Sequence, residues 1–511
     1  MKKNYVLAFI LSFGVLMSWQ YFMGRRHTPT LAPDTPAGWP AAPATPAAAS
    51  GSAVSTPEPA VRHTRSVVFD IGANRISINR FGGGVSQWEI QDRGRWLTLL
   101  PEKEFSSQPL STFSDVEFDV RQDGNALIFS GKKSNGLSIV KTLTISPEKP
   151  IHQISVTITN TAAAPLTATY ELGWGPGVEG GDETGKDGRE AKGFQRAVGY
   201  GNGKLKKLKA GVESGTYDWW GVDGHYFLAA FFSNPGAVPA AGTLRIDKED
   251  HYFSVRRAVS VTANPGETHE TGMSFYLGSK GYEDLKALGL GLERAVDFGY
   301  FAPFGRVIHR ALFLFEKGTG NYGWAIIVLT FIIQILVLPL TIKSFQHAQK
   351  MKNIQPQMKR LQELYKNDSR RLNSEMLALY QRHGLRFMGM EGCVPMLIQL
   401  PVFWALFSTL RNTFELRYAP WMGWVKDLSV HDPFYVLPVL MGAGMFVQQK
   451  MTMSSMDPSQ KQIMYLMPII FTFFFLKMPS GLVIYWLTNS LLTIGVQWYL
   501  MRRAATGEVV K

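Results

Sequence analysis

Five long apolar segments in the C-terminal part of the chain constrain its fold more than any other feature. They occupy residues 322–342, 393–410, 434–447, 463–476 and 482–501. A helix needs about 17–25 apolar residues to cross a bilayer. The first and last segments meet that length and the second just meets it. The third and fourth require polar flanks that reach the interface, or a thinner bilayer. The sequence therefore predicts five membrane-spanning helices within residues 320–503.

A sixth apolar segment lies near the N-terminus. It covers residues 5–23, follows Lys2 and Lys3, and ends before Arg25 and Arg26. The apolar core of a cleaved signal peptide is shorter, about 7–15 residues, so we expect residues 1–26 to form an uncleaved anchor. Residues 27–61 are rich in Pro, Ala and Thr and nearly lack large apolar side chains. This composition predicts a semi-rigid linker.

Residues 62–279 consist of short alternating runs separated by turn residues. Between residues 137 and 145, for example, Leu137, Ile139 and Leu143 share one strand face with Lys141. Such period-two patterning, rich in Val, Ile and Thr, is typical of half-buried antiparallel strands. We therefore predict a β-sandwich, with the glycine-rich residues 173–188 and 199–203 as surface loops.

The same region carries Asp218, Trp219 and Trp220, for which two interpretations stay open. A tryptophan pair can form a platform for sugar rings, but large aromatic residues are more often buried in a core or an interface. The histidines of this region are scattered and lack the spacing of metal ligands. We expect core or interface tryptophans here and no metal site.

Residues 280–319 change to helical periodicity, and two amphipathic helices are expected. The apolar positions of the first are Leu285, Leu288, Leu292 and Val296. The basic positions of the second, within residues 304–315, are Arg306, His309 and Arg310. A basic face opposite an apolar face predicts a helix lying in the membrane interface. A soluble helix packed on the β-domain would show the same pattern.

Residues 344–386, between the first two of the five spans, predict a cytoplasmic hairpin of two antiparallel helices. An apolar stripe with helical spacing runs along this segment and is interrupted at residues 366–369. Such a stripe packs one helix against another, and Pro356 is expected to kink or restart the first helix. The stripe consists of Met351, Ile354, Met358, Leu361, Tyr365, Leu372, Met376, Leu379 and His383.

The charge distribution predicts the topology. The net charge is +13, and residues 343–391 hold ten basic residues against four acidic ones. By the positive-inside rule this loop, both termini and the tail, residues 504–511, belong in the cytoplasm. The β-domain then lies in the periplasm, on the outer side of the inner membrane. Because the charge gathers beside the spans, an anionic membrane is favoured over nucleic acid as its partner.

No motif for catalysis or cofactor binding fits its required context. Two G-x-G-x-x-G matches, at residues 175–180 and 318–323, lack a strand–turn–helix unit. The spans lack ionisable residues near their centres, which disfavours ion-coupled transport. They carry uncharged polar residues instead, which either bond between helices or together line a wet groove. The sequence predicts no enzyme activity, no cofactor and no metal.

Four motifs in the core carry a resemblance to a known family. Residues 321–327 read Asn-Tyr-Gly-Trp-Ala-Ile-Ile, and their span ends in Leu-Pro-Leu-Thr-Ile-Lys at 338–343. Residues 392–401 read Gly-Cys-Val-Pro-Met-Leu-Ile-Gln-Leu-Pro, residues 432–438 Asp-Pro-Phe-Tyr-Val-Leu-Pro, and residues 479–482 Pro-Ser-Gly-Leu. Over nearly its whole length the chain resembles the YidC-type membrane insertases of Gram-negative bacteria.

The resemblance implies an insertase and membrane chaperone that acts alone or with the Sec translocon, through a groove open to cytoplasm and lipid. Its implied partners are newly made membrane proteins, Sec components and the phospholipid bilayer, with the ribosome as a further candidate. The sandwich is similar to the galactose mutarotase-like fold and is implied to be a docking surface, not an enzyme. The implied groove and client-contact residues are Thr330, Gln334, Leu400, Phe403, Tyr485, Trp486 and Asn489.

The chain departs from the family pattern inside the groove. The family usually has an arginine four residues after the threonine at Thr330, and this sequence has Gln334 there. Trp486 stands where a second tyrosine is usual, and Glu391 is also unusual. Two rival functions stay open. A solute transporter would need inverted repeats around a central site, and a carbohydrate enzyme would need paired acid and base groups in the sandwich.

Overall fold

The structure is a computed structural model. It describes residues 66–101, 105, 108–179, 181–182, 195–232, 241–383, 394–452 and 458–505. The β-domain and the helices that follow it belong to one compact unit, residues 63–511. The predicted anchor and linker, the residues around Glu391 and the tail lie outside the described residues.

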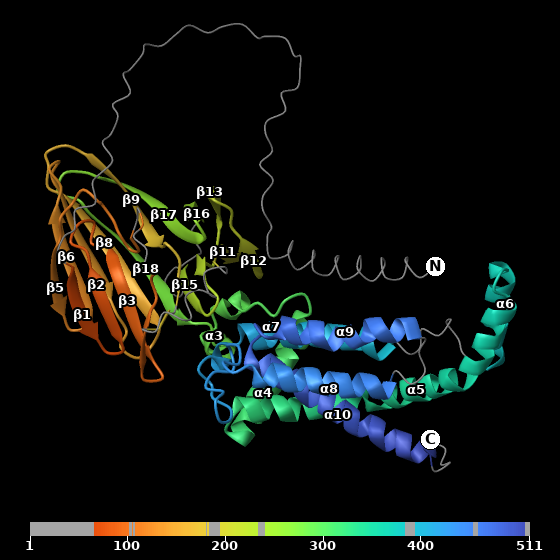
Figure 1. The fold of residues 1–511 in the computed structure, drawn as a ribbon. Coiled ribbons are helices and arrows are strands. Elements are labelled where there is room, and N and C mark those ends of the chain that lie inside the picture. The colour runs from red at the N-terminus through yellow and green to blue at the C-terminus, as the bar shows by residue number, and fades with distance from the viewer. Residues whose placement is uncertain are drawn as a thin grey trace, which may run out of the picture. The chain divides into compact units, whose positions relative to one another are not determined.

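Three antiparallel sheets form the β-domain within the described residues (Figure 1). The first contains, in spatial order, β1 (Val67–Ile71), β2 (Asn74–Ile78), β3 (Val85–Asp92), β4 (Arg95–Thr98) and β10 (Gly181–Asp182). The second contains β12 (Lys204–Lys207), β11 (Arg196–Gly201), β14 (Trp219–Asp223), β15 (Phe227–Phe232), β18 (Thr268–Ser279), β8 (Ile151–Asn160), β7 (Leu137–Thr144), β6 (Ala126–Lys132) and β5 (Asp119–Asp123). The third contains β13 (Gly211–Thr216), β16 (Ala241–Glu249), β17 (Tyr252–Ala263) and β9 (Leu166–Trp174).

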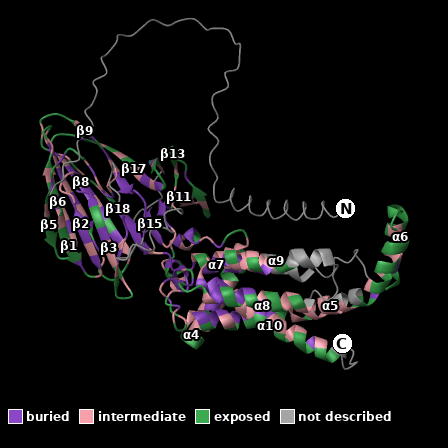
Figure 2. Cartoon of the chain, viewed as in Figure 1, coloured by how far each residue is buried: buried purple, intermediate pink, exposed green. Residues whose placement is uncertain are grey.

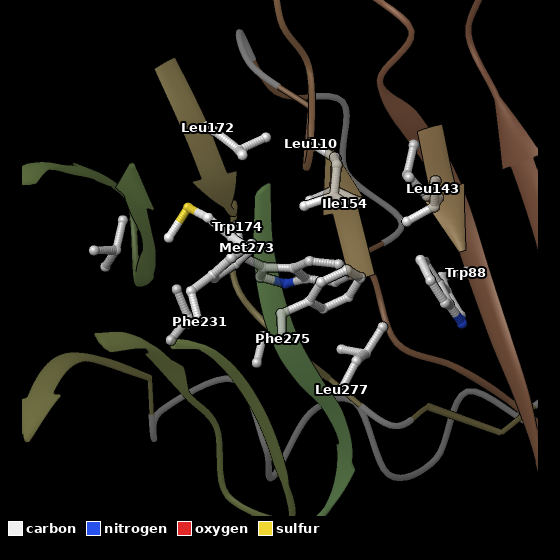
Figure 3. Packing of buried hydrophobic residues seen from close by; sticks show 14 of the residues in the cluster. Trp88, Leu110, Leu143, Ile154, Leu172, Trp174, Phe231, Met273, Phe275 and Leu277 are labelled. Carbon is white, nitrogen blue, oxygen red and sulfur yellow. The ribbon is translucent and has the colours of Figure 1, made fainter. Parts of the chain in front are cut away.

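Alternation along the strands builds the core that joins these sheets. On β7 the residues at 137, 139, 141 and 143 are buried and those between them are half-buried. Aromatic side chains fill the centre, where Trp88, Trp174 and Phe275 pack with ring centroids 6.1–6.4 Å apart (Figure 3). Trp219 and Trp220 are also buried. The β-sandwich and the burial of both tryptophans are therefore confirmed.

Both loop predictions were wrong in part. In the first, Gly173 belongs to β9, Gly181 to β10, and residues 173–179 are buried and do not lie on the surface. Gly199 and Gly201 belong to β11 and are followed by a tight turn in which Asn202 and Gly203 have positive φ angles. Glycine is required in the strand because the ring of Tyr217 lies against Gly199, where a Cβ atom would come within 2.6 Å of it. The glycines therefore allow close packing of strands and do not mark a loop.

The first predicted amphipathic helix is divided in the structure. It consists of α3 (Tyr282–Ala287) and a short 3-10 helix, η1 (Leu292–Ala295). Leu285 and Leu292 are fully buried in a cluster with side chains from β14, β15 and β18. This segment therefore packs on the β-domain, which was the alternative interpretation. Gly289 and Gly291 interrupt the helix because both adopt positive φ angles.

The second predicted amphipathic helix is α4 (Ala302–Thr319), but its faces differ from the prediction. His309 is buried between the rings of Tyr282 and Phe298. Val307 is 68% exposed and lies on the outer side with the basic residues. The placement of His309 on the basic face was wrong, because an imidazole can be buried among aromatic rings as readily as it can face water.

The remaining helices correspond to the predicted core. They are α5 (Tyr322–Leu364), α6 (Ser369–Arg382), α7 (Val394–Asn412), α8 (Val436–Thr452), α9 (Pro458–Phe475) and α10 (Ser480–Ala505). α10 packs on α5 and α8, α9 packs on α8, and α4 packs on α5 and α7. Figure 2 shows exposed residues along the outer faces, with buried residues concentrated in the part of the bundle nearest the β-domain.

One helical stretch among the described residues is both long and apolar enough to cross a membrane. It is Tyr322–Gln346 in α5, with a mean hydropathy of 2.7, and only 22% of its most apolar window is buried. Phe331 and Leu336 therefore face outward, where an apolar surface requires a lipid or protein partner. Membrane crossing by α7, α8, α9 and α10 stays a prediction.

α5 continues well beyond its apolar part. It runs for 43 residues through both Pro339 and Pro356 without interruption, so Pro356 does not restart it. α6 then packs back on its end, with Ile354 and Leu379 buried. α5 and α6 therefore form a pair of packed helices as far as Arg382, and the first of them is the extension of the apolar helix itself. The cytoplasmic position of this pair stays a prediction.

The β-domain and the bundle are joined through the loop after α7. Phe414 is 6% exposed and belongs to the core of the β-domain, where its ring meets Phe227 at 5.6 Å. The carbonyl of Arg417 accepts a 2.7 Å hydrogen bond from the guanidinium of Arg93. At the end of α7, the amide of Asn412 donates to the carbonyl of Asp297 at 2.6 Å. The end of α7 is therefore held by the β-domain and by the segment before α4.

Candidate functional site

The candidate site lies where α5 and α10 pack together. α5 begins at a cap in which the Asn321 side chain accepts hydrogen bonds from the backbone N–H groups of Gly323 and Trp324. Three turns further along, the Gln334 amide donates to the hydroxyl of Thr493 on α10 at 3.4 Å. Gln334 is 9% exposed. The two helices thus share a polar contact between buried or half-buried side chains.

Most threonines of the bundle bond within their own helices. The hydroxyl groups of Thr330, Thr472 and Thr493 donate to the carbonyls four residues earlier at 2.6–2.7 Å. A threonine bonded in this way has no donor left for a neighbouring helix or a client. The uncharged polar groups that can bond outside their own helix are therefore mainly side-chain amides and less often hydroxyl groups.

Aromatic rings surround Trp486, which lies two turns before Thr493 on α10. Its ring meets Phe403 of α7 at 5.2 Å, edge to face, and the α9 rings of Phe471 and Phe475 at 5.9 and 5.3 Å. Phe403 and Trp486 are both half-buried. Aromatic pairs in these arrangements contribute about 0.5–1.5 kcal/mol beyond their burial. This cluster ties three helices together while leaving part of its surface accessible.

The structure separates the residues predicted as client contacts into two groups. Thr330 and Tyr485 are each 1% exposed and lie in the packed interior. Phe403, Trp486 and Asn489 are half-buried, and the Asn489 carbonyl accepts the hydroxyl of Thr493. Leu400 belongs to α7, but its side chain lies outside the described residues. Phe403, Trp486 and Asn489 are thus the best placed to meet another chain, whereas Gln334 is buried at its contact with Thr493.

Charged side chains gather at the β-domain end and not between the helices. Arg196 binds the buried Asp223 at 2.5 Å and Asp297 at 3.1 Å, and Lys280 also binds Asp223. Burial lowers the pKa of Lys280, and Asp223 partly opposes that shift. Burial alone would raise the pKa of Asp297, but the Gly299 N–H and the Arg196 charge hold it below its ordinary value. This network fixes the segment that leads into α4.

Two close contacts in the bundle were not foreseen from the sequence. A Cβ atom on Gly442 of α8 would come within 1.9 Å of the Thr472 hydroxyl on α9. Phe414 enters the β-domain from far along the chain. A glycine within an apolar helix is a signal for the first contact. A lone phenylalanine in a loop carries no comparable signal for the second.

Two family models match adjacent parts of the chain. Residues 97–314 match the YidC periplasmic domain, and residues 314–507 match the 60Kd inner membrane protein. The boundary between the two matches falls inside α4.

Relatives with these names cover most of the chain. The membrane protein insertase YidC of Endomicrobium trichonymphae is 41% identical over 445 residues, which are 83% of this chain and 82% of that protein. The insertase of Syntrophus aciditrophicus is 32% identical over 550 residues, 99% of this chain and 100% of that protein.

Solved structures give weaker likenesses. A YidC insertase crystal structure with its first transmembrane domain resolved covers 86% of this chain and 93% of its own, at 18% identity and a TM-score of 0.41. A putative aldose 1-epimerase from Escherichia coli K12 covers 42% of this chain and 99% of its own, at 9% identity and a TM-score of 0.27. The sequence relatives and the family models are sufficient without them: the chain belongs to the YidC family of membrane protein insertases.

Proposed function

We propose that the chain inserts newly made proteins into the inner membrane along the surfaces of α5, α7 and α10 that carry Gln334, Phe403 and Trp486. The observation that carries this proposal is the contact between Gln334 and Thr493. Its length of 3.4 Å is beyond the usual range of a hydrogen bond, so exchanging it for a client's polar group costs little. An amide in an apolar bundle thereby lowers the high cost of moving polar groups into hydrocarbon.

The half-buried rings of Phe403 and Trp486 extend this surface with an apolar part. A client helix that leaves the amide region meets rings that pack well against apolar side chains. The client's polar end would then contact the amide region beside Thr493, and its apolar segment would contact the rings beside Trp486, on neighbouring parts of α10. Thr330 and Tyr485, which the family resemblance also implies as contacts, become accessible in this proposal only when α5 and α10 separate.

The proposed mechanism does not use a fixed positive charge. Gln334 occupies the position at which the family usually has an arginine, and residues 323–342 contain no Asp, Glu, Lys or Arg. An amide donates and accepts hydrogen bonds without a net charge. We therefore propose that hydration and short helices drive insertion here, and that an acidic client tail gains no special attraction.

The charge pattern supports a six-span topology. Residues 1–26 would anchor the chain, residues 27–61 would link to the periplasmic β-domain at 62–279, and residues 280–319 would lead along the interface into the core at 320–503. The hairpin, residues 344–386, and the tail, residues 504–511, would lie in the cytoplasm with the N-terminus. A cytoplasmic hairpin beside the core suits reception of clients from the ribosome, with or without the Sec translocon.

A non-enzymatic role for the β-domain fits the same proposal. The tryptophan pair that could have formed a sugar platform is buried. Phe414 and Asn412 connect the β-domain to α7, which carries Phe403. We propose that the β-domain holds the periplasmic end of the core and provides a docking surface for partners.

A substitution series at Gln334 tests this proposal in proteoliposomes that contain the full chain and a single-span client with a short translocated tail. Gln334→Leu is expected to lower the insertion rate about threefold to tenfold, as for the loss of about 0.6–1.4 kcal/mol of polar interaction. Gln334→Arg is expected to be tolerated, because it keeps the site polar.

Thr341→Val serves as the matched control. Its hydroxyl bonds the Val337 carbonyl of the same helix, about two turns beyond Gln334, so insertion should be unchanged. Equal rates for the three residues at position 334 would remove Gln334 from the mechanism. Insertion no better than in empty vesicles would overturn the proposed function.

A further inference from the structure

Four lysines stand within six positions at the outer edge of the nine-stranded sheet. They are Lys204, Lys206, Lys207 and Lys209, and all four are exposed. We call residues 204–209 the lysine strand. Leu205 and Leu208, between them, turn inward and pack in two buried clusters. The strand is therefore fixed by its leucines while its lysines project into solvent.

The lysine strand lies at the end of the β-domain that meets the helices (Figure 1). Leu205 is paired with Tyr200 on β11, and Tyr200 contacts Gly291 just before η1. Lys207 is close enough to Asp297 to help hold the pKa of that carboxyl down, after the effects of burial, the Gly299 N–H and Arg196. The Asp297 carbonyl in turn receives the amide at the end of α7.

This position corresponds to the level of the membrane surface. α4 begins at Ala302, shortly after Asp297, and exposes the apolar side chains of Phe304, Val307 and Leu314. A helix with such an outer face, together with basic residues, is typical of the membrane interface. The inference rests on that part of the proposed function, the membrane position of the helices.

Lys204 and Lys209 are available for an external anion, and Lys207 is available in part, because it also lies near the carboxylate of Asp297. Lys206 is paired with Glu213 of β13 at 2.7 Å. Within the described part of the chain, the structure records no ion pair for Lys204, Lys207 or Lys209. Lysines on an edge strand also prevent edge-to-edge pairing. That protective role predicts no dependence on the lipid composition.

We propose that the lysine strand binds the headgroups of anionic phospholipids in the periplasmic leaflet and so holds the β-domain against the membrane. Phosphate is the complementary charge, and the headgroups of a leaflet present many phosphates to a strand at its surface. A lysine near an anionic surface raises the ratio of docked to free strand about fivefold. Lys204, Lys207 and Lys209 together raise it by at most about a hundredfold.

The test uses the full chain in vesicles, with a fluorescent probe at Ala210→Cys in a Cys393→Ser background. Ala210 is exposed directly beside the strand, so a nitroxide on the lipid headgroups quenches the probe when the strand docks. Vesicles of phosphatidylcholine alone are compared with vesicles that also contain phosphatidylglycerol. Quenching is expected to increase with phosphatidylglycerol and to fall again at high salt.

Joint replacement of Lys204, Lys207 and Lys209 by glutamine should abolish the dependence on phosphatidylglycerol. Lys206→Gln alone should have a smaller effect, because Glu213 already neutralises Lys206. The matched control is Arg121→Gln, Lys132→Gln and Lys149→Gln, which removes the same charge from exposed positions elsewhere on the β-domain and should keep the lipid response.

Two results would overturn the proposal. One is equal quenching of the parent protein in both kinds of vesicle. The other is an undiminished response to phosphatidylglycerol after the triple replacement. Client insertion measured in the same vesicles reports separately on the proposed function, so either of these two results together with normal insertion would refute the lysine-strand proposal and leave the proposed function standing.

Discussion

Lys141 lies in the middle of β7, on the strand face that packs into the β-domain. It is 1% exposed, and its ammonium group donates to the carbonyls of Gly82, Gly83 and Leu110. The ring of Phe129 lies 4.5 Å away from the same nitrogen. Lys141 thus joins β7 to the loop between β2 and β3 and to the segment after β4. The alternation of apolar residues in the sequence already predicted that Lys141 lies on this strand face.

Replacing Lys141 by methionine should lower the free energy of unfolding by about 2–4 kcal/mol. The three carbonyl groups would lose their donor while remaining buried, which is the costly way to remove a hydrogen bond. Urea unfolding of the full chain in detergent, followed by tryptophan fluorescence, measures the change. Lys132→Met on the exposed side of β6 is the control. Equal unfolding of the two variants would contradict the structural role of Lys141.

The approach of α8 to α9 depends on a glycine at the point of contact. At Gly442 a Cβ atom would come within 1.9 Å of the Thr472 hydroxyl, whereas at Gly444 the nearest contact is an ordinary 3.6 Å to Ser490. The same helix therefore offers a crowded glycine and an uncrowded one, two residues apart on nearly opposite faces.

Gly442→Ala is expected to destabilise the bundle by about 1–3 kcal/mol through overpacking. Gly444→Ala should be neutral or slightly stabilising, because alanine favours a helix over glycine. Thermal unfolding in detergent compares the two. Adding Thr472→Ala should restore much of the stability lost in Gly442→Ala, because the two sites are in contact. No difference between the two glycine variants would exclude the close approach.

The turn between β14 and β15 should make the attachment of α7 sensitive to acid. His225 in this turn lies beside the Arg411 carbonyl and the Asn412 side chain at 3.1 and 3.2 Å. Burial, with the charges of Arg411 and Lys280, lowers the pKa of His225 to about 4. An unfolded histidine titrates near 6.5.

The unfolded chain therefore takes up a proton before the folded chain does. The contribution of His225 to stability is complete above about pH 6.5 and is lost progressively as the pH falls toward 4. In melting curves across this window, His225→Gln should lose less stability than the parent protein. His251→Gln, in an exposed turn, should follow the parent. Parallel curves for all three proteins would rule out this linkage.

At the scale of elements, the periodicity of apolar residues predicted the features that depend only on residues close together in the sequence. The alternation at 137–145 and the apolar stripes of the helices follow directly from which side each Cβ atom points to. The same reasoning failed at 199–203 and 285–296. Glycines there serve close packing in β11 or break a helix through positive φ angles, and residue type alone does not distinguish these uses.

The candidate site was predictable in part for a related reason. The sequence indicated that Gln334 and Trp486 lie on apolar helices, and the family resemblance implied that they lie near each other. Periodicity does not determine which hydroxyl groups bond within their own helix, as that of Thr330 does. Nor does it show that Tyr485 lies in the interior. Those outcomes depend on how α5 and α10 pack.

For the whole molecule, the packing of Phe414 predicts that the β-domain and the bundle unfold as one cooperative unit. It is buried in the β-domain core although it belongs to the loop after α7. We expect one unfolding transition for the parent protein in calorimetry, and Phe414→Ala should cost about 3–5 kcal/mol and give two transitions. Phe434→Ala, at a position 67% exposed, should leave one transition. A single transition in both variants would show that the two parts are not coupled through Phe414.

The position of Phe414 along the chain also sets an order of assembly. A ribosome makes every strand of the β-domain before it reaches Phe414. The newly made β-domain therefore has an unfilled slot beside Phe227 until Phe414 packs there. Because α7 is predicted to cross the bilayer, we expect Phe414 to fill this slot only after the far end of α7 has reached the side on which the β-domain lies. A chain whose α7 had not crossed would keep an unfilled apolar slot in its β-domain, so completion of the β-domain core would itself report correct threading.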